Sequence, residues 1–86
     1  MKHAGADALD RLEPMLVQLR TFPALKEKSR GVFYVSSKAF LHFHEDPSGL
    51  FADVRLDADD DFKRWPVSSD AERVRLLREI EECLRR

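Results

Sequence analysis

The chain has 86 residues and a mass of 10.0 kDa, which is the size of one domain and leaves no room for a second lobe. Fifteen Lys and Arg against sixteen Asp and Glu give a net charge of −1, so no overall positive field attracts nucleic acid or an acidic membrane surface. With 43% apolar and 36% charged residues, the composition is that of a folded domain and not of a disordered segment.

The single cysteine, Cys83, excludes an internal disulfide and fits a reducing compartment. No apolar run approaches the ~20 residues of a membrane span, and the first residues lack the apolar stretch of a secretory signal. We therefore expect a cytoplasmic, bacterial protein without membrane contact. Residues 1–86 form one domain in this interpretation, with residues 1–5 disordered and His3 in that frayed segment.

Apolar residues recur at helical spacing in the first segment, and they predict an amphipathic helix over Ala6–Arg20. Pro14 interrupts this pattern, so either the helix kinks there or Pro14 takes the first position of a shorter helix. Phe22-Pro23 ends the helix because the residue before proline avoids the helical region. The polar stretch Lys26–Arg30 is predicted to be a loop.

From Gly31 the pattern changes to that of strands. β-Branched and aromatic residues at 32–35 predict a first strand, Ser36-Ser37-Lys38 predicts a tight reversal, and Ala39–Glu45 predicts a second strand. Asp46-Pro47-Ser48-Gly49 has the residue preferences of a type I turn, and it leads into a third strand over Leu50–Leu56.

An acidic connection, residues 57–61, precedes the last predicted strand. Phe62–Val67 is expected at a sheet edge, because Pro66 would remove a hydrogen bond from the centre of a sheet. Such an edge also offers a surface for a homodimer.

Ser69 and Glu72 have the spacing of a capping box, and an apolar stripe after them predicts a helix that extends to about Arg85. The element order is α-β-β-β-β-α. The predicted fold class is therefore α+β, a two-layer sandwich in which an antiparallel four-stranded meander carries the N-terminal and C-terminal helices on one face.

Direct closure at the Asp46–Gly49 turn predicts the register of the central hairpin, with His42 opposite Asp53 and His44 opposite Phe51. One face then holds the apolar residues that meet the helices, which are Ala39, Leu41, Phe43, Ala52, Val54 and Leu56. The opposite face, called the mixed face here, holds Phe40, His42, His44, Phe51, Asp53 and Arg55, with Phe33 and Val35 added if the first turn also has an even length.

Two functions fit the mixed face. As a small binding or interaction module, the protein would use Phe40 and Phe51 as exposed contact area, and His42 and Arg55 would donate hydrogen bonds to a carboxylate or phosphate. The ligand is then an unknown protein or small molecule, with no cofactor. The alternative is a metal-dependent site of His42, His44 and Asp53, a set of two histidines and one carboxylate that suits Zn or Fe.

A third interpretation is purely structural: His42 and Asp53 form a cross-strand pair among stacked aromatic rings. In that case we expect the adjacent carboxylate to raise the pKa of His42. No catalytic signature stands out in the chain, so the sequence leaves open whether it is an enzyme.

The stretch Gly31–Leu56 contains FLHFHEDP from Phe40 and LFADVR from Leu50, and it resembles a group of small uncharacterised bacterial proteins with the same order of helix and hairpin. The motif Phe62-x-Arg64-x-Pro66-Val67 and the closing helix extend this likeness over most of the chain. More distantly, the hairpin is similar to that of the luciferase-like domain of unknown function. The resemblance implies kinship and implies no activity.

Overall fold

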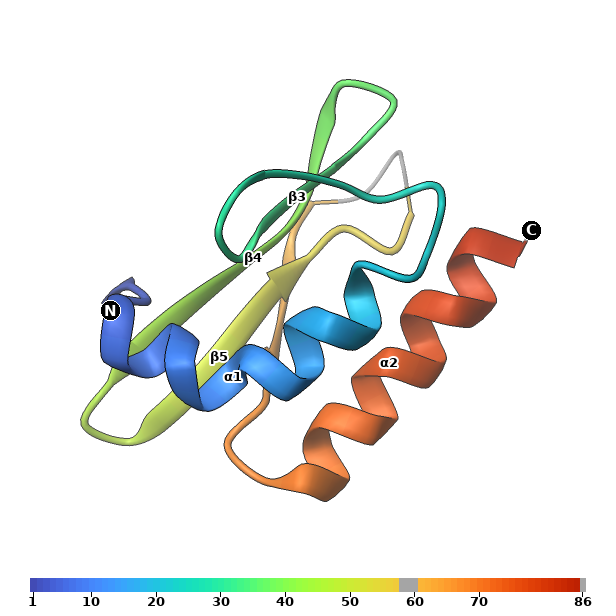
Figure 1. The fold of residues 1–86 in the computed structure, drawn as a ribbon. Coiled ribbons are helices and arrows are strands. Elements are labelled where there is room, and N and C mark those ends of the chain that lie inside the picture. The colour runs from blue at the N-terminus through green and yellow to red at the C-terminus, as the bar shows by residue number, and fades with distance from the viewer. Residues whose placement is uncertain (58–60, 86) are drawn as a thin grey trace.

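The structure, a computed structural model, describes residues 1–57 and 61–85 (Figure 1). It is an α+β fold, as predicted, but the described residues form an antiparallel sheet of six strands where four were expected. The elements in chain order are β1 (Lys2–His3), α1 (Ala6–Leu19), β2 (Lys26–Ser29), β3 (Val32–Val35), β4 (Lys38–Asp46), β5 (Gly49–Val54), β6 (Lys63–Pro66) and α2 (Asp70–Arg85).

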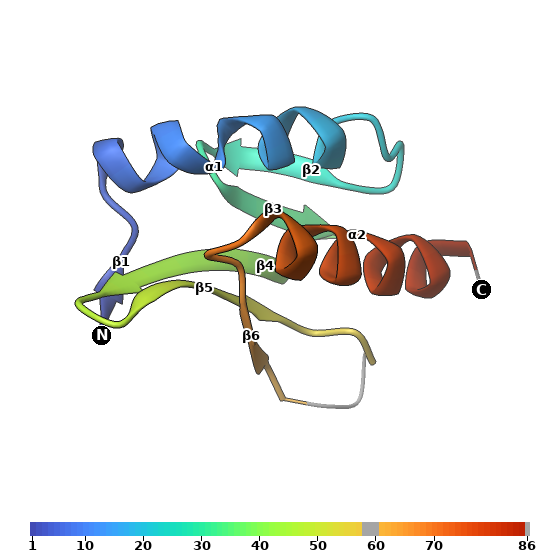
Figure 2. The same ribbon diagram turned by 90° about the horizontal axis from the view of Figure 1, so that it is seen from below.

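The fold has two layers, and both helices lie on the same side of the sheet (Figure 2). The strand order is β2-β3-β4-β5-β6, and β1 pairs separately with β4. Between the layers, Leu12 and Leu16 of α1 and Leu76 and Ile80 of α2 belong to one hydrophobic core with the sheet residues beneath them. Burial of these leucine and isoleucine side chains contributes about 1.5–3 kcal/mol each to folding.

The two predicted helices are confirmed. Helix α1 runs through Pro14 without ending, so the alternative of a shorter helix that starts at Pro14 is wrong. Its buried residues are Ala8, Leu12, Met15, Leu16 and Leu19, which line one helical face. Helix α2 begins with the predicted capping box: Ser69 Oγ accepts from the Glu72 N–H, and the Glu72 carboxylate accepts from the Ser69 N–H.

Two predictions about the polar segments are wrong. Residues 26–29 form strand β2 instead of a loop, and residues 2–3 form strand β1 instead of a disordered end. Both strands are mostly exposed and lack an alternating apolar pattern, so their own side chains do not specify them. They form because β3 and β4 present free backbone edges to which they add.

The two hairpin turns set the positions of the central strands. Ser36 and Ser37 connect β3 to β4 with φ values of 48° and 71°, the left-handed conformation that a two-residue hairpin loop requires. At the second turn, Asp46 pairs with Gly49, and Asp46 Oδ1 accepts from the Ser48 N–H at 2.8 Å. The predicted direct closure of this turn is therefore confirmed.

A register shift in the first hairpin changes which residues face the core. The loop between β3 and β4 has the even length of two residues, yet Phe33 pairs with Leu41 while Tyr34 pairs with Ala39, which leaves Phe40 as the extra residue of a bulge. Phe33 is 1% exposed and Phe40 is 5% exposed, and both belong to the hydrophobic core. Their predicted place on an exposed mixed face is wrong.

Among the described strands, β6 pairs only with β5, which confirms the predicted edge position. Residues 58–60, in the middle of the predicted acidic connection, lie outside the described residues. None of the described helices is long and apolar enough to cross a membrane.

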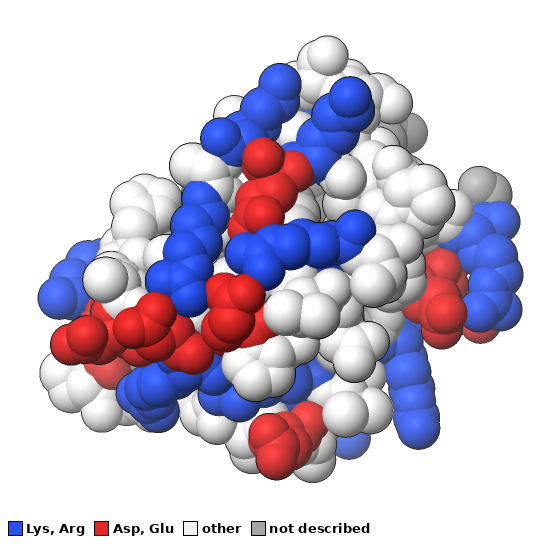
Figure 3. Space-filling view, in the orientation of Figure 1, with Lys and Arg blue, Asp and Glu red and all other residues white. Residues whose placement is uncertain are grey.

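The face seen in Figure 3 shows basic and acidic side chains beside one another. On α1 and the residues around β2, Arg20 binds Glu13 and Glu27, and Arg30 binds Asp10 and Glu13. On that face, positive and negative side chains of the described residues alternate and form no patch of a single sign.

Candidate functional site

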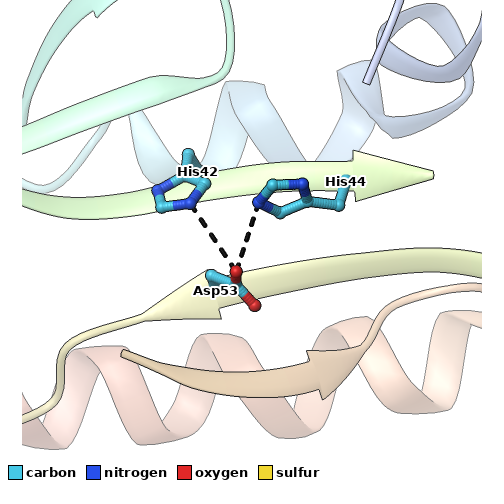
Figure 4. A group of neighbouring side chains, drawn as sticks. All are labelled: His42, His44 and Asp53. Atoms are coloured by element: carbon cyan, nitrogen blue, oxygen red, sulfur yellow. Dashed lines mark ion pairs between the residues drawn. The ribbon is translucent and has the colours of Figure 1, made fainter. Parts of the chain in front are cut away.

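Three side chains of the mixed face converge on the sheet surface opposite the helices. The register is the predicted one, with His42 of β4 opposite Asp53 of β5 and His44 opposite Phe51. Because alternate residues of a strand point the same way, His42 and His44 both reach over Asp53 (Figure 4). We call His42, His44 and Asp53 the His–Asp cluster.

The geometry of the His–Asp cluster is compact. Asp53 Oδ2 lies 3.6 Å from His42 Nε2 and 3.2 Å from His44 Nε2. One ligand atom from each of the three residues lies within 4.8 Å of the others. The two imidazole rings meet edge to face, with centroids 4.8 Å apart. Two imidazole nitrogens and a carboxylate oxygen therefore point into one small volume.

Besides the two histidines, Asp53 contacts Arg64 of the neighbouring strand β6. The Arg64 guanidinium donates two hydrogen bonds to the carboxylate, from Nε to Oδ1 at 2.8 Å and from Nη2 to Oδ2 at 2.9 Å. Arg64 stands directly across from Asp53 in the pairing of β5 with β6. This partner was not predictable from the sequence, because no short turn joins β5 to β6 and so none sets their register.

These contacts decide the protonation states. The hydrogen bonds from Arg64 hold the pKa of Asp53 below its ordinary value, against the opposing effect of burial. Burial and the neighbouring His44 lower the pKa of His42, and the Asp53 charge only partly offsets them. The expected rise of the His42 pKa is therefore wrong, because desolvation of His42 and the neighbouring His44 together outweigh the Asp53 charge. At neutral pH the cluster holds a carboxylate and a neutral His42.

His44 is the buried histidine of the cluster, with 9% of its surface exposed, the same fraction as for Asp53. Neither of its ring nitrogens has a hydrogen-bond partner within the described part of the chain. Its Nε2 is close to Asp53 Oδ2, but the two atoms do not meet the angles of a hydrogen bond. A buried polar group without a partner costs about 1–3 kcal/mol, so the burial of this imidazole lowers the stability of the fold.

The third histidine of the chain, His3, lies beside the cluster on the N-terminal strand β1. His3 pairs with His44, and their rings stack with centroids 4.7 Å apart. The Glu45 carboxylate holds this strand, since Oε2 accepts from the Gly5 N–H at 2.6 Å. Sequence analysis assigned His3 to a frayed end; the one available signal was that the chain has only three histidines.

The other predicted residues of the mixed face do not form an open contact surface. Phe40 is in the core, while Phe51 and Arg55 are half-buried. Phe62 packs over this face, with its ring 5.0 Å from that of His42 and 4.5 Å from the Arg55 guanidinium carbon. The structure thus brings His42, His44 and Asp53 together and separates Phe40 from them.

Comparisons with known proteins add no relative. No family model matches the chain, and no match was found among curated proteins or solved structures. The resemblance to small bacterial proteins and to the luciferase-like domain of unknown function stays a prediction.

Proposed function

We propose that this protein is a small binding module whose ligand is a divalent transition metal ion, with Zn²⁺ as the representative ion. His42, His44 and Asp53 are the ligands. The observation that carries the proposal is the buried His44 imidazole, which has no hydrogen-bond partner among the described residues and whose Nε2 lies 3.2 Å from a carboxylate oxygen of Asp53. Two imidazoles and one carboxylate are a ligand set that Zn²⁺ and Fe²⁺ favour.

The protonation states support this ligand set. A metal ion needs imidazole nitrogens without protons and an ionised carboxylate. The lowered pKa of His42 and the lowered pKa of Asp53 both favour these forms at neutral pH. Three protein ligands leave at least one coordination position for water or a small ligand, and the His42 side chain, 22% exposed, gives access from solvent.

Arg64 competes with a metal ion for the Asp53 carboxylate, so replacing Arg64 tests the proposal. Its Nη2 donates to Asp53 Oδ2, the oxygen that faces both histidines. An incoming cation must share that oxygen with a guanidinium or displace it. The Arg64 side chain is 47% exposed, so it has room to move away.

The experiment is zinc titration by calorimetry on the full chain at pH 7.5, prepared without a histidine tag and stripped with a chelator. We expect one equivalent of Zn²⁺ and an affinity that His44→Ala lowers by about 100-fold or more. Arg64→Gln should raise the affinity about tenfold, because the carboxylate is freed; a tenfold change corresponds to about 1.4 kcal/mol. Co²⁺ should give the visible absorption bands of a site with imidazole ligands in the unmodified protein and lose them in His44→Ala.

His3→Ala is the matched control, since it removes the histidine that lies beside the cluster and is not one of its proposed ligands. The zinc affinity of His3→Ala should stay within about threefold of that of the unmodified chain, a change in binding free energy below 1 kcal/mol. Absence of zinc binding in the unmodified chain, or an equal loss in His3→Ala and His44→Ala, would overturn the proposal. Failure of Arg64→Gln to strengthen binding would show that Arg64 does not compete with the metal ion for Asp53.

A further inference from the structure

A second feature lies at the end of the sheet where the first hairpin turn meets the last turn of α2. It is a hollow of about 430 Å³, within the range of small-molecule sites. Val35, Phe40, Leu56 and Leu84 supply apolar lining. The Cys83 thiol donates to the Leu56 carbonyl oxygen at 2.9 Å, which fastens the end of α2 to one wall.

The charged residues of the lining are both cations. Lys38 and Arg55 line the hollow, and none of the described lining residues is acidic. The Arg55 Nε is buried and has no hydrogen-bond partner among the residues that the structure describes. The Arg55 guanidinium instead stacks on the Phe62 ring, a contact that satisfies none of its N–H donors.

Arg55 and Lys38 both line the hollow, and a carboxylate is the acceptor that matches the geometry of a guanidinium group best. The apolar lining stabilises a hydrocarbon body, and the two cations stabilise a single negative head. Arg55 and the hollow share no residue with the proposed metal ligands, so the two sites can be tested separately.

We propose that this hollow binds a small amphipathic monocarboxylate, with its hydrocarbon chain against Phe40, Leu56 and Leu84 and its carboxylate on Arg55 and Lys38. The partner class is a free carboxylic acid of medium chain length. The bulge that turns Phe40 into the core also gives the hollow part of its apolar lining, so the proposal follows from the observed register of β3 and β4.

The test uses octanoate as the probe and the full chain labelled for NMR, with zinc absent. Titration should shift the amide signals around the hollow with saturable behaviour, and 1-octanol should bind at least about tenfold more weakly because it lacks the charge. Arg55→Gln should weaken octanoate binding about tenfold while leaving octanol binding unchanged. Arg78→Gln is the matched control, because Arg78 is an exposed arginine of α2 that does not line the hollow.

A variant that fills the hollow at an exposed residue can remove binding without disturbing the core. Ala24 is exposed and lines the hollow, so Ala24→Trp should fill it and abolish octanoate binding without placing bulk in the core. His44→Ala should bind octanoate normally, which distinguishes this site from the metal site. Equal binding of octanol and octanoate, equal effects of Arg55→Gln and Arg78→Gln, or unaltered binding in Ala24→Trp would each overturn the proposal.

Discussion

Asp53 and Arg64 stand opposite each other on β5 and β6, and the guanidinium holds both oxygens of the carboxylate. This pair is the main cause of the lowered pKa of Asp53, and Arg64 also adds to the lowering of the pKa of His42. Without it, Asp53 would act on His42 and His44 as a full negative charge. In the folded protein, burial and the neighbouring His44 outweigh the Asp53 charge, and the pKa of His42 lies below its ordinary value.

Removing Arg64 should therefore raise the pKa of His42. Arg64→Gln takes away a nearby positive charge and leaves the Asp53 carboxylate to favour the imidazolium. The pKa is measured by NMR titration of the His42 ring protons in metal-free buffer. Arg78→Gln, a charge change of equal size on α2, serves as control and should leave it unaltered. An unchanged His42 pKa in Arg64→Gln would contradict the role given to Arg64.

The lowered pKa of His42 predicts a loss of stability in mild acid. A group whose folded pKa lies below its unfolded value of about 6.5 contributes stability in full above that value, and the contribution is lost as pH falls through the folded pKa. Urea unfolding with a chelator present should show the free energy of unfolding falling between pH 7 and pH 5, with a slope of at most about 1.4 kcal/mol per pH unit from this residue. His42→Asn should reduce the slope; a slope that stays the same would assign the effect to other groups.

Gly49 should not tolerate a side chain. Its φ is +143°, and a Cβ there would lie 2.4 Å from Ser68 Oγ. Gly49→Ala should cost about 1–3 kcal/mol of unfolding free energy through backbone strain and this clash. Part of that cost should disappear when Gly49→Ala is made in a protein that already carries Ser68→Ala. The nearest atom to the new Cβ is then the Cβ of residue 68, at 3.6 Å. Strict additivity of the two changes in urea unfolding would rule out the clash.

Glu45 should control the attachment of β1 to the sheet. Its carboxylate accepts from the Gly5 N–H, and the Ala4 N–H donates to the Phe43 carbonyl oxygen at 3.0 Å. Glu45→Ala should speed hydrogen exchange of the Ala4 amide about tenfold, as expected for loss of a hydrogen bond to a charged group. Glu81→Ala, on exposed α2, should not change that rate. Protection of Ala4 that survives Glu45→Ala would show that the β1–β4 ladder alone holds the strand.

The sequence by itself determined the parts of this protein that depend on neighbours in the chain. Both helices follow from apolar spacing and capping, and their bounds agree with the structure to within about one residue. The register of β4 with β5 follows from the Asp46–Gly49 turn, because a two-residue loop leaves only one pairing. The meeting of His42, His44 and Asp53 was predictable for the same reason.

Tertiary structure alone decided the features that depend on distant pairing. The bulge at Phe40 shifts Phe33 and Phe40 into the core, where filling the space under the helices outweighs an unbroken ladder. Strands β1 and β2 form on backbone edges that their own polar side chains do not reveal. Arg64 and His3 reach the His–Asp cluster from opposite sides of the β4–β5 hairpin, through pairings that no short turn imposes. Local rules therefore set the helices and one hairpin, and non-local strand pairing set the electrostatics of the site.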